Sequence, residues 1–157
     1  MAKSHEERQF TQMAGEFGVV SELFRRQYQA TITYGNSKSA DVFVINKVGN
    51  GVVKVEVKST VLKSWIVGQQ AEKVENHIVW VFAHLPTPEN VFSSAQVAEI
   101  GKGSPRYYVL TSQEVHQIYS QKKEKKGDKR GPITFGLSDI QFNRNDWHKV
   151  QDAMRNT

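Results

Sequence analysis

One segment sets the strictest limits on the fold: in KVEVKST, residues 54–60, apolar and charged residues alternate. A period of two is that of a β-strand with one apolar face and one polar face. The apolar face carries valines, and the polar face carries Lys54, Glu56 and Lys58 in a row. Such a polar face is either a solvated sheet surface or a functional site.

A second strand, ADVFVINK (40–47), precedes this segment, and the turn VGNG (48–51) between them predicts a β-hairpin. Asp41 lies eight residues before Gly49, and Glu56 lies seven residues after it. If the chain reverses at 48–50, the two carboxylates reach the same level on strands about 4.8 Å apart. Lys58 faces the same way as Glu56, because strand side chains alternate. Two carboxylates and an ammonium group at this spacing predict a Mg²⁺ site with a lysine beside it.

Around the hairpin, the order of elements predicts an α/β domain with a mixed central β-sheet flanked by helices. Apolar residues at spacings of three and four predict a helix over roughly the first 25 residues. Its expected apolar face consists of Phe10, Met13, Phe17, Val20 and Phe24. Further strands are expected at 29–34, 77–85 and 106–110, and a short helix at 68–75.

Two more helices are expected toward the C-terminus. Thr111 and Glu114 have the spacing of a capping box, so a helix should begin at Ser112 and run to about Lys123. A last helix should begin near Asp146, whose carboxylate can cap it. The stretch KKEKKGDKRG (122–131) is expected to be a charged connector.

Composition limits the classes of protein that fit. At 157 residues the whole chain, 1–157, is expected to be a single domain, because domains commonly run about 100–200 residues. It contains no cysteine, which excludes disulfides and Cys-based zinc sites. The longest apolar run, IVWVFA (78–83), is far shorter than the roughly 20 residues that span a bilayer. We therefore expect a cytoplasmic protein without a membrane partner.

The positive charge is concentrated in the C-terminal third. Residues 1–99 hold 10 Lys and Arg against 10 Asp and Glu, whereas residues 100–157 hold 11 against 6. The entire net charge of +5 therefore lies in the basic part, 100–157. Such asymmetry favours a polyanionic partner, with nucleic acid the first candidate. The residues expected to contact phosphates are Lys122, Lys123, Lys125 and Lys126, although a solvated charged loop is an equally good interpretation.

The acidic and basic positions of the hairpin resemble the signature of the PD-(D/E)xK nuclease superfamily. That signature is an acid at the end of one strand, then (D/E)xK on the next, often preceded by a glutamate on a helix. Here the positions read Asp41, then Glu56-Val57-Lys58, with Glu16 in the GEFG stretch (15–18) of the first helix. Ala40 stands where the motif has its proline. The resemblance covers residues 10–85 and is closest to the Holliday-junction-resolvase-like and restriction-endonuclease-like branches.

The resemblance implies a restriction-endonuclease-like core and a Mg²⁺-dependent endonuclease that hydrolyses DNA phosphodiester bonds, with Mn²⁺ able to substitute. Asp41, Glu56 and the backbone carbonyl of Val57 would bind the metal. Glu16 would act through a metal-bound water or on a second ion. Lys58 would orient or deprotonate the attacking water, or neutralise charge in the transition state. Recognition of DNA structure, or targeting by a partner, is favoured over a long specific sequence.

Weaker signals surround this site. Lys38 lies in the loop before the Asp41 strand and Lys54 shares the face of Glu56, so both are expected to contact the nucleic-acid backbone. Gln69 and Gln70 occupy a position where several branches of the superfamily place a polar residue.

Other chemistries and partners fit less well. The histidines are scattered, and GKGS (101–104) lacks the spacing of a P-loop.

DNA is favoured over RNA, and a homodimer is left open. The alternative function is a non-catalytic nucleic-acid-binding subunit that retains the nuclease fold.

Overall fold

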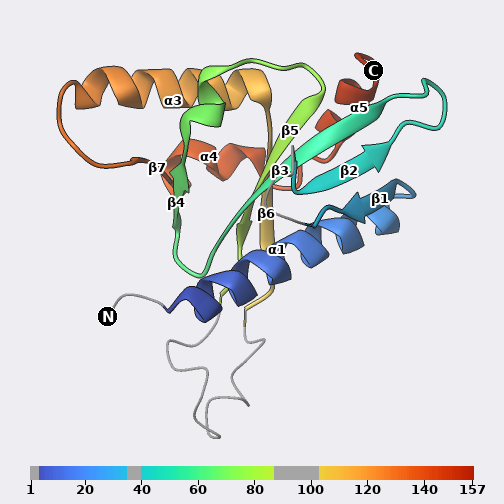
Figure 1. Ribbon diagram of the computed structural model, residues 1–157, viewed down its shortest axis with the longest axis horizontal. Coiled ribbons are helices and arrows are strands. Elements are labelled where there is room, and N and C mark those ends of the chain that lie inside the picture. Colours follow the sequence, from blue (N-terminus) through green and yellow to red (C-terminus); the bar gives the residue numbers. More distant parts are fainter. Residues whose placement is uncertain (1–3, 35–39, 87–102) are drawn as a thin grey trace, which may run out of the picture.

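A five-stranded mixed β-sheet forms the centre of the computed structural model, which describes residues 4–34, 40–86 and 103–157 (Figure 1). The strand order is β1-β2-β3-β5-β6, with β3 and β5 parallel and the other neighbouring pairs antiparallel. The five strands are β1 (Gln29–Ile32), β2 (Val42–Ile45), β3 (Val52–Thr60), β5 (Ile78–His84) and β6 (Arg106–Thr111). The mixed α/β architecture expected from the sequence is confirmed.

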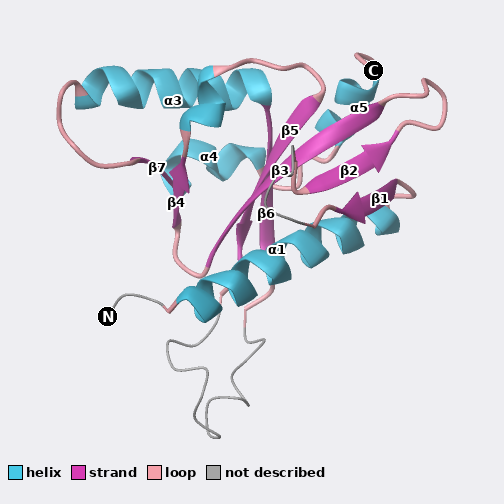
Figure 2. Ribbon diagram, in the orientation of Figure 1, coloured by secondary structure: helices cyan, strands magenta, loops and turns pink. Residues whose placement is uncertain are grey.

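Helices and a second, smaller sheet surround this centre (Figure 2). The helices are α1 (His5–Arg25), α3 (Ser112–Lys126), α4 (Leu137–Ile140) and α5 (His148–Met154), with 3-10 turns η1 (Gln69–Glu72) and η2 (Gln141–Asn143). A two-stranded ribbon pairs β4 (Ser64–Val67) with β7 (Ile133–Gly136). No helix in the described ranges is both long enough and apolar enough to cross a membrane.

The β2–β3 hairpin has the register that the sequence predicts. Its ladder runs from Ile45 opposite Val52 to Val42 opposite Val55. The turn is held by the Asn46 side chain, which accepts hydrogen bonds from the N–H groups of Val48 and Gly49. One position beyond the last ladder pair, the register brings Asp41 to the level of Glu56. The charged face of β3 therefore meets Asp41 at the end of the hairpin.

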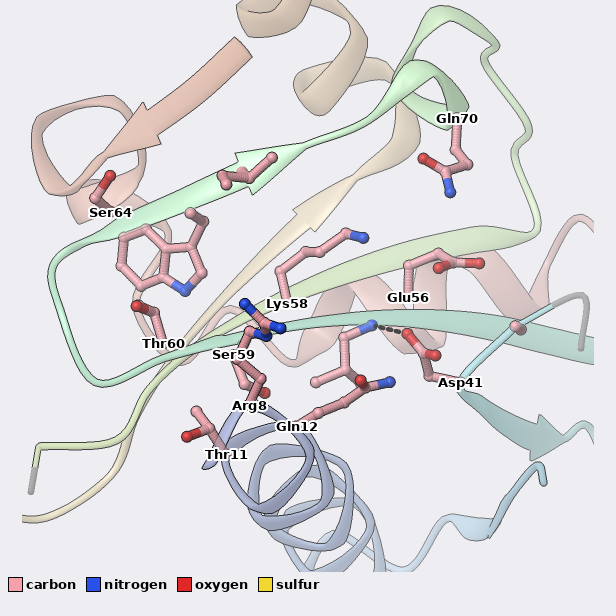
Figure 3. Close-up of a pocket in the computed structure, with 14 residues that line it drawn as sticks. Arg8, Thr11, Gln12, Asp41, Glu56, Lys58, Ser59, Thr60, Ser64 and Gln70 are labelled. Atoms are coloured by element: carbon pink, nitrogen blue, oxygen red, sulfur yellow. Dashed lines mark hydrogen bonds between the residues drawn. The ribbon is translucent and has the colours of Figure 1, made fainter. Parts of the chain in front are cut away.

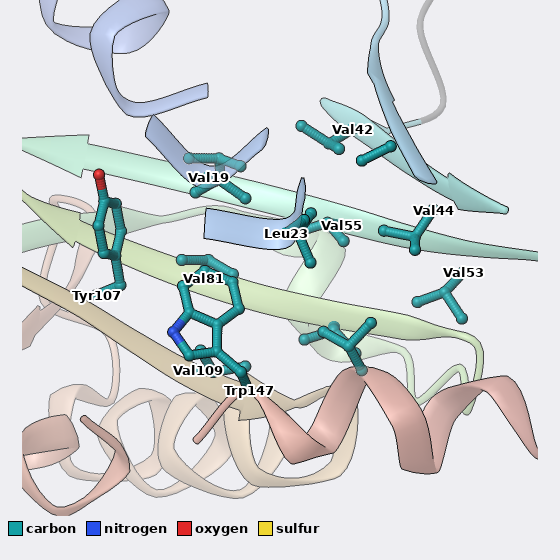
Figure 4. Packing of buried hydrophobic residues seen from close by; sticks show 14 of the residues in the cluster. Val19, Leu23, Val42, Val44, Val53, Val55, Val81, Tyr107, Val109 and Trp147 are labelled. Atoms are coloured by element: carbon teal, nitrogen blue, oxygen red, sulfur yellow. The ribbon is translucent and has the colours of Figure 1, made fainter. Parts of the chain in front are cut away.

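Two apolar layers cover the central sheet. On one face, Val19 and Leu23 of α1 and Trp147, just before α5, pack against alternate residues of the strands, among them Val55 and Val81 (Figure 4). On the other face, α3, α4 and the β4–β7 ribbon pack against the large side chains of β5 and β6. These side chains are Trp80, Phe82, Tyr108 and Leu110. No residue of β3 belongs to this second cluster, so the polar face of β3 borders the layer without being covered by it.

The side of α1 that faces the sheet differs from the side expected. Gly15, Glu16, Val19 and Leu23 are buried, whereas the phenylalanines of the expected apolar face lie toward solvent. Glycine explains which side of α1 faces the sheet. A Cβ at Gly15 would lie 1.7 Å from Ser59 Oγ, closer than two non-bonded atoms can approach. The glycine side of α1 is thus the side that can lie close to β3.

Three other expectations are corrected. The 68–75 helix is only the 3-10 turn η1, and β4 precedes it where no strand was expected. The capping box at Thr111 and Glu114 is present, but α3 continues to Lys126, so the four lysines belong to a helix and not to a connector. The predicted cap of α5 by Asp146 is wrong, because the helix begins after Trp147 without a side-chain cap. The Asp146 carboxylate instead pairs with Lys149.

Candidate active site

A cleft of about 600 Å³ lies between the first half of α1, the polar face of β3, β4 and η1 (Figure 3). Asp41, Glu56, Val57 and Lys58 line it, as the hairpin register leads one to expect. The face of β3 that the sequence marked as either solvated or functional is therefore one wall of a concave site. This is the shape in which ligand sites are usually found.

Asp41 is held at the point where the β2–β3 ladder ends. Its Oδ2 accepts a hydrogen bond of 2.8 Å from the backbone N–H of Val57, and its own N–H donates to the carbonyl of Val55. In a strand, the N–H groups of alternate residues point to the same neighbouring strand. The N–H of Val57 is one of those in β3 that point toward β2. The Asp41 carboxylate therefore takes the place of a backbone acceptor, which fixes its position while the side chain is only 7% exposed.

The same alternation places the carbonyl oxygen of Val57 on the Asp41 side of β3, because the N–H and C=O of one residue point to the same neighbour. The donor set at this point is then one carboxylate from each strand and a backbone oxygen. Mg²⁺ prefers oxygen ligands and usually keeps several waters beside one or two carboxylates. The residues present fit such an ion.

Lys58 is positioned by an aromatic surface. Its Nζ lies 5.9 Å from the centroid of the Trp80 ring, within the about 6 Å range of a cation–π contact. Glu56 is opposite Trp80, and Lys58 is opposite Phe82, in the parallel β3–β5 pair. Both side chains project from the same face of β3 toward η1, where Gln70 faces them across the cleft (Figure 3).

The structure places Glu16 on the buried side of α1. It is 1% exposed, is not among the residues lining the cleft, and accepts a 2.9 Å hydrogen bond from the amide of Gln12, which does line it. Among residues 4–34, 40–86 and 103–157, no group of three or more Asp, Glu or His side chains is placed to hold a metal ion. One connection of Glu16 to the cleft therefore runs through Gln12.

The α1 wall of the cleft contains residues that the sequence patterns did not single out. Arg8, Thr11 and Gln12 line the cleft from α1, and Ser64 and Ile66 line it from β4. A signal for the helical group was present, because Arg8, Gln12 and Glu16 recur every four residues and so share one helix face. No comparable signal marked the residues of β4.

The basic residues expected to contact nucleic acid are dispersed. Lys38 lies outside the described residues. Lys54 lies on the face of Glu56, two residues before it, and is partly exposed.

On α3, two of the four lysines already have carboxylate partners. Lys122 Nζ is 2.9 Å from Asp139, and Lys123 pairs with Glu72. The hydrogen bond and charge of the Glu72 carboxylate raise the pKa of Lys123 above its ordinary value.

Comparison with known proteins supports the fold. No protein-family model matches the chain, and no curated protein sequence matches it. Among solved structures, the fold is similar to that of a bacterial homing endonuclease, I-Ssp6803I, with a TM-score of 0.52. The match covers 99% of this chain and 97% of that chain at 12% sequence identity. At this identity the similarity is one of fold: the five-stranded mixed sheet with flanking helices is a fold that a nuclease also has.

Proposed function

We propose that this protein is a metal-dependent endonuclease of the PD-(D/E)xK type that hydrolyses DNA. The observation that supports this most is the convergence of Asp41, Glu56 and Lys58 in one cleft. The similarity of the fold to that of a homing endonuclease supports the same reaction class. A structural α/β domain has no need of two carboxylates and a lysine on a concave, uncovered strand face.

Each residue has a distinct role in the proposed reaction. Asp41, Glu56 and the Val57 carbonyl would bind Mg²⁺, which supplies Lewis acidity to the scissile phosphate and an activated water. The hydrogen bond from Val57 N–H fixes the direction of the Asp41 carboxylate, whose second oxygen would bind the ion. Gln12 would orient a water or a phosphate oxygen, with its amide fixed by Glu16.

Lys58 would act on the charge that develops at phosphorus. An ammonium group that is partly buried in a cleft stabilises a developing negative charge more strongly than one in water. The Trp80 ring restricts the positions that the side chain can take, so less reorganisation is needed when the charge appears. We therefore assign Lys58 an electrostatic role in preference to that of a general base.

Substrate recognition in this proposal relies on the backbone of DNA more than on its bases. Arg8 is exposed at the α1 wall of the cleft, and Lys54 continues the row of Glu56 and Lys58 along β3. These cations are positioned to contact phosphates that flank the cleaved bond. Contacts of this kind give orientation without sequence information, which agrees with selection by DNA structure or by a partner.

Incubation of the purified protein with supercoiled plasmid, a synthetic four-way junction and RNA tests the proposal. We expect cleavage of DNA in Mg²⁺ or Mn²⁺ and none in EDTA, with 5′-phosphate and 3′-hydroxyl ends. DNA binding without cleavage under any metal condition would instead identify a non-catalytic binding subunit that kept the fold. The absence of both binding and cleavage would contradict both proposals.

The basic end of α3 gives a further prediction, on affinity. Changing Lys122, Lys123, Lys125 and Lys126 to Gln should weaken DNA binding to a similar degree for different sequences. The slope of log K against log salt concentration should fall by up to about 0.9 for each phosphate that the helix no longer neutralises. Because Lys122 and Lys123 already pair with carboxylates, we expect the four changes to affect fewer than four phosphates.

Fluorescence anisotropy at several salt concentrations measures this slope. Lys47→Gln, at an exposed position in the β2–β3 turn, serves as the control for a lysine that lies away from α3. An unchanged affinity and slope in the quadruple variant would show that α3 does not contact the nucleic acid.

A further inference from the structure

The outer side of α1 carries a stripe of exposed phenylalanines. Phe10, Phe17 and Phe24 recur every seven residues and are 57%, 54% and 52% exposed. They lie opposite the buried side formed by Gly15, Val19 and Leu23, so the sheet does not cover them. The stripe extends for about 21 Å along the helix at 1.5 Å per residue. Three large aromatic side chains in line on one helix are the pattern of a surface that is buried in an assembly.

Small residues lie between the phenylalanines. Ala14 and Ser21 are exposed on the same side of α1, so the stripe alternates large and small side chains at spacings of four and three. A helix with this pattern can receive the large side chains of a second helix in the gaps above its small ones, at interaxial distances of about 8–10 Å. The pattern is complementary to itself, which is the requirement of a two-fold interface.

From these features we propose that α1 pairs antiparallel with α1 of a second copy of this chain, forming a homodimer through the Phe10, Phe17 and Phe24 stripe. If residue n of one helix lies opposite residue 31 − n of the other, Phe17 meets Ala14 and Phe10 meets Ser21. The two phenylalanines nearer the centre then each face a small side chain, and Phe24 lies at the end of the pair, opposite Glu7. This inference concerns assembly and does not depend on the proposed nuclease activity.

The charges at the ends of α1 favour the antiparallel direction. Glu6 and Glu7 lie in its first turn and Arg25 in its last turn. In the pairing above, Arg25, which already pairs with Glu22 of its own helix, lies opposite Glu6 of the second copy at both ends of the interface. A parallel pair would instead place the acidic turns side by side, and like charges at that distance repel. Antiparallel helix dipoles add to the same preference.

The exposed area is adequate for the centre of a dimer interface. At about half exposure, three phenylalanines offer on the order of 300 Å² per copy, since each such side chain buries about 150–250 Å². A standard interface buries about 800 Å² per partner. The stripe would therefore be the apolar centre, and the flanking polar residues of the 21-residue helix would form the rim.

Sedimentation equilibrium of the whole protein, without DNA or metal, tests the proposal. We expect a dimer for the wild-type chain. Phe17→Glu should raise the dimer dissociation constant by about 30-fold or more, the effect of losing a hot-spot side chain. Phe142→Glu is the matched control, because Phe142 is 88% exposed and belongs to η2, outside the stripe; this variant should remain a dimer.

Charge reversal tests the direction of the pairing with all three phenylalanines in place. Arg25→Glu and Glu6→Arg should each weaken the dimer, and the double variant should recover it. A monomeric wild-type chain throughout the micromolar range would overturn the proposal. Equal weakening by Phe17→Glu and Phe142→Glu would do the same, and failure of the double variant to recover association would overturn the antiparallel pairing.

Discussion

Glu56→Gln and Lys58→Ala are each expected to reduce metal-dependent DNA cleavage by at least about 10²–10³-fold, the effect of removing one preorganised electrostatic contact to a transition state. Glu56→Gln keeps the size of the side chain and removes the charge that would bind the ion. Lys58→Ala removes the ammonium group above Trp80. Both positions are only partly buried, so neither change should affect folding.

The measurement is the single-turnover cleavage rate at saturating DNA, with circular dichroism to verify the fold. Glu124→Gln and Lys47→Ala are controls of the same residue types at exposed positions outside the cleft. Wild-type rates in both site variants would contradict the assignment of this cleft. A marked decrease in Glu56→Gln with little effect of Lys58→Ala would retain the metal site and remove the proposed role of the lysine.

Lys149→Ala is expected to lower the free energy of unfolding by about 2–3 kcal/mol, at the low end for a broken buried ion pair. Lys149 is 8% exposed; its Nζ donates hydrogen bonds to Glu114 and to the carbonyl of Val109, and forms an ion pair with Asp146 at 3.3 Å. Removing it leaves two carboxylates and a buried carbonyl without this donor. The effect is moderated because Glu114 and Asp146 keep about a third of their side chains in water.

Thermal unfolding should show the change as a decrease in Tm of roughly 5–10 °C, and Lys47→Ala, at an exposed position, should show none. The difference should also depend on pH. Burial acts to raise the pKa of Glu114, but hydrogen bonds and charge from Lys149, together with Thr111, hold it below its ordinary value of 4.5. A lowered pKa stabilises the fold above the ordinary value, and this stabilisation disappears as pH falls through the lower, folded value.

The two proteins should therefore differ most near neutral pH and become more alike in acid. Denaturant unfolding from neutral pH down to below the ordinary carboxyl pKa measures this. A difference that stays constant over the whole range would show that the ion pair is not its source.

Local patterns account for the parts of the fold that the sequence predicts well. The alternation in 52–60 and the turn at 48–51 depend on neighbouring residues only, and the hairpin forms with the expected register. The capping box at Thr111 and Glu114 is equally local, and α3 begins at the expected residue. The two carboxylates and the lysine of the cleft could be located from the sequence because all three lie on this one hairpin.

Features that depend on distant segments could not be predicted. The β4–β7 ribbon joins segments about 70 residues apart, and each strand is too short to show a period. On α1, Phe17 and Val19 are both apolar but face opposite sides. Hydrophobic periodicity favours the phenylalanine side, whereas the close approach to Ser59 that only Gly15 allows selects the other.

The cap of α5 failed for a related reason. Asp146 has the right residue type and position for a cap, yet a lysine three residues later offers it an ion pair. Whether a carboxylate caps a helix or pairs with a cation depends on where the lysine is held. Here that place is set by the carbonyl of Val109 and by Glu114, both far away in the sequence.

The register of the β2–β3 hairpin determines which side chains of β3 face the cleft. Because side chains alternate, a slip of the β2–β3 register by one residue would turn Glu56 and Lys58 toward α1 and present valines to the cleft. A slip by two residues would restore the face but displace Glu56 along the strand by about 6.6 Å, out of step with Asp41. The pairing of β3 with β5 on its other side opposes such a slip and so keeps the charged side chains of β3 in the cleft.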